Sequence, residues 1–253
     1  MSIIKNELLK QKKTLFILCI LFPLLSNALL YVDLTYRYEA YLLIHQSEYG
    51  LSNWQLIFKE QTVFYFSEIC HIIAATIVYE IFSIELKYNA WMLVSSSPYR
   101  KSKVLFGKYV IAMIAFLLFF VVDYASLIFI GKAIGVQGKL EIALFVKSFC
   151  VQFAAASMLI AFYLLFTCLF RRIVYLIPVG CVFMVLNISL YYTENVQFLV
   201  QYPTTYISHC FRASVKEAIT SIVLSGIFTV SFLVLSKLTL SNNRDIHLSL
   251  IHI

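Results

Sequence analysis

The sequence predicts an all-α membrane protein with six transmembrane helices and both termini in the cytoplasm. Of the 253 residues, 61% are hydrophobic and only 13% are charged, whereas a soluble domain carries about 25% charge. The apolar residues gather in long runs, and most charged residues lie between these runs. A folded chain of this composition has too little polar surface to face water on all sides, so lipid is expected to cover part of it.

Six apolar runs are each long enough to cross a bilayer as a helix. About 20 mostly apolar residues are needed to cross about 30 Å of hydrocarbon. Backbone groups in lipid must be bonded within the protein, and the runs lack the alternating pattern of barrel strands, so helices are predicted. With no repeat or linker in the chain, residues 1–253 are expected to form one transmembrane domain. The predicted spans cover residues 14–32, 62–82, 109–130, 144–170, 173–192 and 218–235.

The basic residues orient the predicted helices. Thirteen of the twenty lysines and arginines fall on the side that holds both termini. Because segments rich in lysine and arginine stay in the cytoplasm, that side is predicted to be cytoplasmic. This bias also explains the net charge of +7. No basic stripe or soluble domain is present to bind nucleic acid, so nucleic acid is not expected as a partner.

Three segments outside the spans are informative. Residues 1–13 are predicted to form a short interfacial helix, because Ile4 and Leu8 share a face and neighbouring lysines can reach headgroups; a disordered start is the alternative. Residues 33–60, on the outer side, are too short to form a catalytic domain. Residues 193–216 are half apolar and are expected to dip into the outer leaflet, where irregular backbone needs protein or water cover.

The residue pattern supports neither a metal site nor a redox site. Five of the six cysteines lie in apolar runs, where they are expected to pack as small hydrophobic residues, and none forms a CxxC pair. Glu68 and His71 form a Glu-x-x-His pattern, which is half of a di-iron site, but no second copy exists. No catalytic residue and no metal ligand is therefore predicted.

The most distinctive stretch covers about residues 83–103, between the second and third predicted spans. Residues 85–93 suit a short amphipathic helix with Leu86, Ala90 and Leu93 on one face, and Pro98 ends it. A basic cluster follows before the next span. The exposed face of such a helix is expected to dock a soluble partner. The alternative is an ordinary inner loop whose tryptophan anchors it at the interface.

This order of residues resembles the permease subunits of ABC-2-type ABC transporters. An acidic residue ends a span, and Asn-x-Trp, a short apolar helix, a proline, a basic cluster and Gly-Lys follow, over about residues 80–108. The interfacial helix, the six spans and the two outer segments also match that family in layout. Within it, the chain is most similar to the permeases of lantibiotic and other antimicrobial-peptide immunity exporters.

The resemblance implies a coupling helix that docks on cytoplasmic ABC ATPase subunits. It also implies the bacterial plasma membrane, a second permease subunit of the same or a different chain, alternating access, and an amphipathic cationic peptide as cargo. The residues expected to form or flank the docking contact are Glu85, Asn89, Trp91, Pro98, Arg100 and Lys103.

The ATPase is expected to be a separate chain. A P-loop needs G-x-x-x-x-G-K-[ST], but Gly107-Lys108 is followed by Tyr109 and has no glycine five residues before Gly107. ATP and Mg are therefore expected on the partner. This chain is expected to bind no cofactor of its own and to be a transport subunit, not an enzyme.

Ionisable residues within the predicted spans are candidates for a cargo path. Glu68, His71 and Asp123 are such residues, and ionisable groups in lipid are costly and often functional. Facing the seam between two permeases, they would attract a cationic peptide or a proton. The alternative is that Glu68 lies near the outer interface and pairs with a neighbour.

Two other functions are compatible with the sequence. A self-sufficient secondary transporter or channel would have Gly/Pro-broken helices in matching halves. Only the fifth predicted span has a candidate break, at Pro178 and Gly180. An intramembrane enzyme would need catalytic polar residues at one depth, a condition that Glu68, His71 and Asp123 meet only if packing brings them together.

Overall fold

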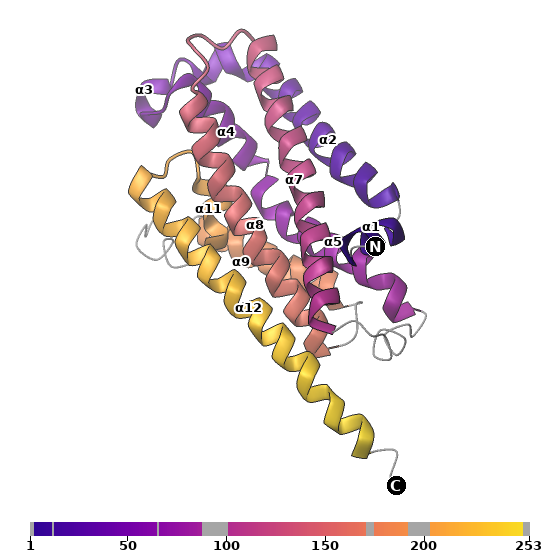
Figure 1. Cartoon of the computed structure of the whole chain (residues 1–253). Helices are drawn as coiled ribbons and strands as arrows, with labels where there is room; N and C mark the ends of the chain where they lie inside the picture. Colours follow the sequence, from indigo (N-terminus) through magenta and orange to yellow (C-terminus); the bar gives the residue numbers. More distant parts are fainter. Residues whose placement is uncertain are drawn as a thin grey trace.

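A computed structural model describes residues 3–11, 13–64, 66–87, 101–170, 175–191 and 203–249, and within them the regular structure is entirely helical. Figure 1 shows the helices as one elongated bundle. The elements are α1 (Ile3–Lys10), α2 (Lys13–Arg37), the π-helical turn η1 (Tyr38–Leu42), α3 (Gln46–Tyr49), α4 (Asn53–Val63), α5 (Phe66–Lys87), α7 (Lys101–Ala133), α8 (Ile142–Phe170), α9 (Leu176–Tyr191), the 3-10 turn η3 (Pro203–Thr205), α11 (Tyr206–His209) and α12 (Val215–Ser249).

Four described helices are long and apolar enough to cross a membrane, which confirms an all-helical membrane protein. They are Lys13–Leu42, Lys101–Ala133, Ile142–Phe170 and Val215–Leu240. The apolar parts of α5 and α9, Ile69–Ser83 and Leu176–Ser189, are shorter. The six predicted spans therefore correspond to four long and two short apolar helices, and the topology with cytoplasmic termini stays a prediction.

The helix ends differ from the predicted spans in an informative way. The prediction that one span covers residues 62–82 is wrong at its start, because Thr62 and Val63 end α4 and α5 begins at Phe66. Hydropathy does not reveal this break, since the residues next to it on both sides, Val63, Phe64 and Phe66, are apolar. Similarly, α7 begins at Lys101, so basic residues that were assigned to a connecting loop lie on a helix.

The long helices pack in neighbouring pairs. Helix α2 packs against α7, α8 against α12, and α5 against α9, while α7 and α8 contact each other and join these pairs. Figure 1 shows α2, α7, α8 and α12 side by side. Helix α1, the end of α5 and the start of α7 lie toward the lower part of that view, which we call the α1 end of the bundle.

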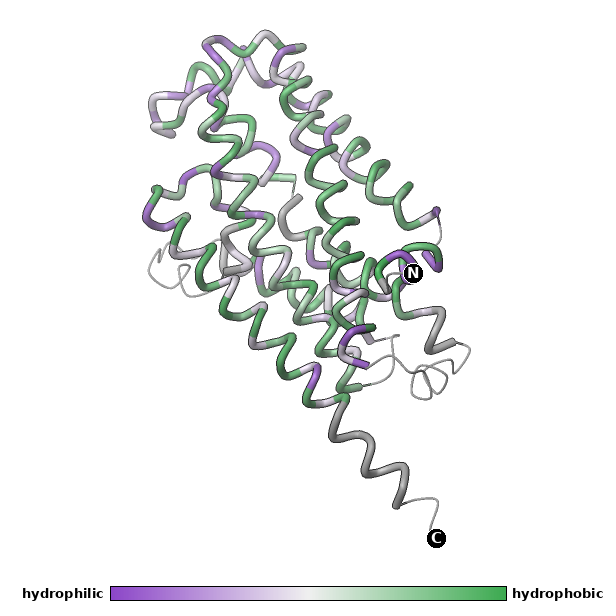
Figure 2. The backbone as a smooth tube through the Cα atoms, viewed as in Figure 1, coloured by the Kyte–Doolittle hydropathy of each residue, from purple (hydrophilic) through white to green (hydrophobic). Residues whose placement is uncertain are grey.

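The bundle has an aromatic core and an apolar outer surface. Phe116, Phe119 and Phe120 of α7 are fully buried, with ring centroids 5.5–5.6 Å apart. On α12, by contrast, Val223 and Val230 are 53% and 62% exposed. Figure 2 shows that hydrophobic residues cover most of the long helices. Exposed apolar stripes of this kind are expected where lipid, not water, surrounds the helix.

The described parts of the two segments that were predicted to lie on the outer side pack against the bundle. Ser52 begins α4 with a capping box, because its side chain accepts from the backbone N–H of Gln55 and its own N–H donates to the Gln55 side chain. Trp54, Ile57 and Phe58 of α4 are buried. In the last segment Ile207, Cys210 and Phe211 are also buried, and α11 contacts α5 and α8. This short helix is therefore covered by protein, and the prediction that residues 193–216 dip into the outer leaflet stays a prediction.

Candidate functional site

Three helices bring polar side chains together around Asp123, inside the bundle. Asp123 comes from α7, Asn27 from α2 and Gln61 from α4, and all three are buried. The amide nitrogens of Asn27 and Gln61 each donate a hydrogen bond of 2.8 Å to Oδ1 of Asp123. Ser126 lies beside them and accepts a hydrogen bond of 2.6 Å from Asn27 Nδ2. We call these four residues the Asp123 junction.

The two carboxyl oxygens of Asp123 differ in their hydrogen bonding. Oδ1 accepts two hydrogen bonds, but Oδ2 has no hydrogen-bond partner among the described residues. No lysine, arginine or histidine forms an ion pair with Asp123 in the described part of the chain. A buried carboxylate without a cation is costly. The chemistry open to this arrangement is therefore to hold a proton at Oδ2, or to attract a cation there.

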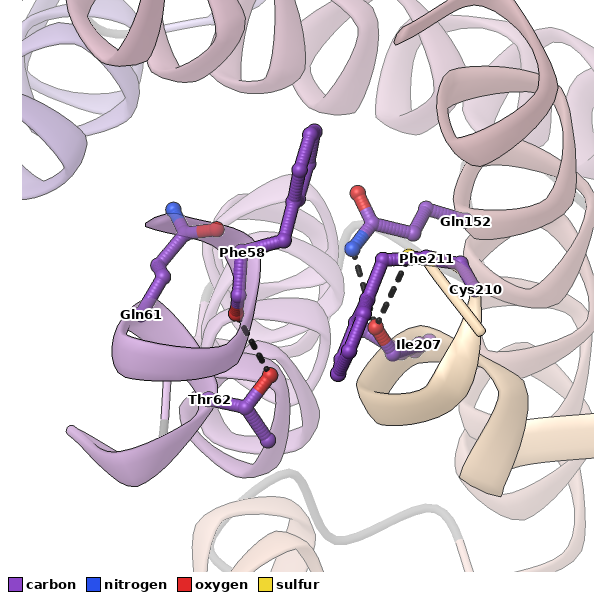
Figure 3. A pocket seen from close by; sticks show the side chains of 7 residues that line it. All are labelled: Phe58, Gln61, Thr62, Gln152, Ile207, Cys210 and Phe211. Carbon is purple, nitrogen blue, oxygen red and sulfur yellow. Dashed lines mark hydrogen bonds between the residues drawn. The ribbon is translucent and has the colours of Figure 1, made fainter. Parts of the chain in front are cut away.

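A second polar contact lies between α4, α8 and α11 (Figure 3). Gln152 Nε2 donates to Ile207 O at 2.9 Å, and its Oε1 accepts from the Tyr124 hydroxyl at 2.8 Å. Figure 3 also shows Gln61 and Thr62 lining the same place. The surrounding side chains leave no room for a water molecule. This place is therefore a packed seam between helices and not a cavity for cargo.

The other candidates for a cargo path lie apart from these contacts or outside the described side chains. His71 of α5 is buried, and its ring is nearly parallel to that of Phe183 of α9, with centroids 6.5 Å apart. It takes no part in the hydrogen bonds of the Asp123 junction. The side chain of Glu68 lies outside the described residues. A shared cargo path for the three residues stays a prediction.

Most of the predicted docking segment lies outside the described residues. This holds for Asn89, Trp91, Pro98 and Arg100, and for the side chain of Glu85, whose backbone belongs to α5. Lys103 is described and is exposed on the first turn of α7. The helices on either side of the segment, α5 and α7, meet it at the α1 end of the bundle (Figure 1).

A buried ion pair at this end was not predicted. Lys108 Nζ of α7 lies 3.1 Å from Glu7 Oε2 of α1, and it also donates to Ile81 O of α5 at 3.0 Å. Lys10 Nζ forms a second ion pair with Glu7 Oε1 at 2.6 Å. The sequence predicted Lys108 in a connecting segment, just before the span of residues 109–130. The apolar residues Val104, Leu105 and Phe106 that precede it were the available signal, since they extend the apolar run toward the N-terminus.

Within the described residues, no cluster of three or more histidine, cysteine, aspartate or glutamate side chains is arranged to hold a metal ion. The fold and these sites define the class: a multi-pass, all-helical membrane protein with a buried polar junction among its helices. No family model, no curated protein and no solved structure matches the chain. Its function is therefore inferred from its own residues.

Proposed function

We propose that this chain is the membrane-spanning permease subunit of an ABC exporter in a bacterial plasma membrane. It moves an antimicrobial peptide or another amphipathic cargo outward, and a separate cytoplasmic ATPase supplies the energy by hydrolysing ATP. The observation that carries the proposal is the residue order over about 80–108, which includes the end of α5 and the start of α7; α7 packs against α1 at this end of the bundle.

The surroundings of this segment favour a role in force transmission. Lys108 contacts Glu7 of α1 and the carbonyl of Ile81 in α5, so one side chain joins α1 to both helices that flank the segment. A partner that pushes on residues 88–100 would therefore act on α1, α5 and α7 together. An ordinary surface loop has no need of such a buried contact, which is costly to form.

The N-terminal helix also agrees with the proposal. Ile4 and Leu8 of α1 are exposed, as the interfacial-helix prediction requires, and Lys5 is exposed beside them. Helix α1 is described as a regular helix, not as a disordered start. In the proposed permease this helix lies at the cytoplasmic surface, α5 and α9 complete the six spans, and a second permease subunit completes the transport path.

Co-purification tests the proposal. The tagged chain is isolated in mild detergent from membranes of its own organism, and proteins that accompany it are identified. We expect a P-loop ATPase with the wild type and its loss with Trp91→Ala and Arg100→Glu. Lys139→Glu is the matched control for the charge reversal, because Lys139 is exposed in the α7–α8 connection, far from the α1 end (Figure 1).

Recovery of the chain without an ATPase, under conditions that preserve other ABC complexes, contradicts the proposal. Equal loss of the ATPase in Lys139→Glu would place the docking site elsewhere. A secondary transporter is the second candidate, because Asp123 Oδ2 is a buried proton acceptor without a partner. In that case transport into vesicles follows an imposed pH gradient and is independent of ATP.

A further inference from the structure

An apolar groove lies between α7 and α12 at the α1 end of the bundle, and none of the contacts above uses it. Its volume is about 240 Å³. The walls are apolar, with Phe106 56% exposed on one side and Val230 62% exposed on the other. The residues that line it are Ser102, Leu105, Phe106, Val230, Leu233, Val234 and Lys237.

The two polar residues of the groove, Ser102 and Lys237, each lie near an end of a membrane-length helix. Ser102 is the second residue of α7 and stands between Lys101 and Lys103. Lys237 lies close to the end of the membrane-length stretch Val215–Leu240 of α12. In a bilayer leaflet the acyl chains lie inside and the headgroups lie at the surface. An apolar wall that ends in exposed basic residues matches this arrangement, because the wall can contact acyl chains and the basic residues can contact headgroups.

We propose that this groove binds an anionic phospholipid of the leaflet at the α1 end. One acyl chain lies along Phe106, Val230 and Val234, and the phosphate accepts hydrogen bonds from Lys237 and Ser102. The proposal does not depend on the transport function proposed above.

The shape and charge of the groove favour this occupant. A volume of about 240 Å³ lies below the roughly 300–1,000 Å³ typical of pockets that enclose a small-molecule ligand, so a thin chain fits better than a compact molecule. Lys237 is exposed and forms no ion pair with the described residues. Basic pockets between membrane helices bind anionic headgroups.

A second copy of the chain fits the groove less well. If two copies met through this face about an axis normal to the membrane, the same residues of each would approach one another. The two Lys237 side chains would then repel, and none of the described residues that line the groove is a carboxylate that could separate them. A lipid phosphate, in contrast, supplies the missing negative charge.

Native mass spectrometry tests the proposal with phosphatidylglycerol as the anionic probe and phosphatidylcholine as the neutral one. The full chain in detergent is titrated with each lipid, and the bound fraction is measured. We expect tighter binding of phosphatidylglycerol, and a loss of about fivefold in its affinity in Lys237→Gln, with phosphatidylcholine unchanged. Lys132→Gln, which removes an exposed lysine at the other end of α7, should behave as the wild type.

Val234→Trp tests the contribution of the apolar wall separately from that of the Lys237 charge. It fills the apolar wall and keeps Lys237, so it should reduce the binding of both lipids. Val234 is 49% exposed, so the larger side chain is not expected to prevent folding. Equal affinity of the two lipids for the wild type, or no effect of Lys237→Gln, overturns the proposal. Disulfide-linked dimers of Val234→Cys formed in membranes would assign the groove to a second copy and also overturn it.

Discussion

The ammonium of Lys108 and the carboxylate of Glu7 form an ion pair of 3.1 Å that is withdrawn from solvent, with side-chain exposures of 0% and 4%. The Lys108 ammonium also lies 4.9 Å from the ring centroid of Phe82. The pair joins the N-terminal helix to α7, at the end of the bundle where α5 ends and α7 begins. Removing one partner of a buried ion pair is strongly destabilising, so a substitution of Glu7 is expected to lower the stability of the fold.

Glu7→Gln should lower the free energy of unfolding by about 3–5 kcal/mol, because it removes one partner of a buried ion pair. Lys10→Gln is the matched control, since it removes the partner of Glu7 that is 43% exposed, and it should cost no more than about 1 kcal/mol. Unfolding is followed by thiol labelling, because Cys19, Cys70, Cys168 and Cys210 are buried in the fold. Equal effects of the two changes would contradict the role of the buried pair.

Gly131→Ala should lower the free energy of unfolding by about 1–3 kcal/mol, as overpacking does. A Cβ at this position of α7 would collide with the Trp54 ring of α4, which Phe145 holds from another side at a centroid distance of 5.5 Å. Gly226→Ala on α12 is the control, because an added Cβ meets nothing within 4 Å there. The control should be neutral, or stabilising by up to about 1 kcal/mol, since alanine favours helix. The same labelling assay measures both, and similar destabilisation by both changes would argue against the α4–α7 contact.

Asp123→Leu should lower the free energy of unfolding by about 1–3 kcal/mol, because it removes the acceptor of the two 2.8 Å hydrogen bonds from Asn27 and Gln61. Asn27 Nδ2 keeps Ser126 Oγ as an acceptor, so most of the loss is expected from Gln61. Asp123→Asn should cost less, because the amide oxygen can replace Oδ1 as the acceptor. If Asp123 belongs to the cargo path, Asp123→Asn abolishes transport while the fold persists. Normal transport by this variant would leave the junction with a structural role alone.

Stability should fall with acidification through the titration of His209. Burial, followed by the nearby Arg212 charge, lowers the pKa of His209 from 6.5 to about 4. The unfolded chain therefore binds a proton more readily than the folded one, and stability is lost as the pH falls from about 6.5 to about 4. The loss is at most about 3 kcal/mol. His209→Gln should flatten this part of a stability curve measured against pH, and an unchanged slope in that variant would exclude His209 as the cause.

The sequence predicted the long helices well where an apolar run has polar borders. Residues 144–170 were predicted as a span, and α8 covers Ile142–Phe170. The prediction was wrong where two helices follow each other with little polar sequence between them, as at α4 and α5. Hydropathy averages over about 19 residues, so it does not resolve a break of two or three residues.

The candidate site could be predicted only in part. Asp123 was singled out because a carboxyl group in an apolar run is conspicuous. Its partners were missed, because Asn27 and Gln61 are uncharged and lie 96 and 62 residues away in the sequence. His71 was grouped with Asp123 on residue type alone, and the structure places its ring beside Phe183 instead.

The sequence by itself determined that the chain is a helical membrane protein, because composition and the length of apolar runs decide which segments enter lipid and lipid requires internally bonded backbone. It also singled out the segment between α5 and α7 by its residue order. Only the tertiary structure decided that Glu7, Lys108 and Ile81 meet, and that Asn27, Gln61 and Asp123 share a junction. These contacts depend on which faces of distant helices pack together, and that choice is made by the fit of side chains across the whole bundle.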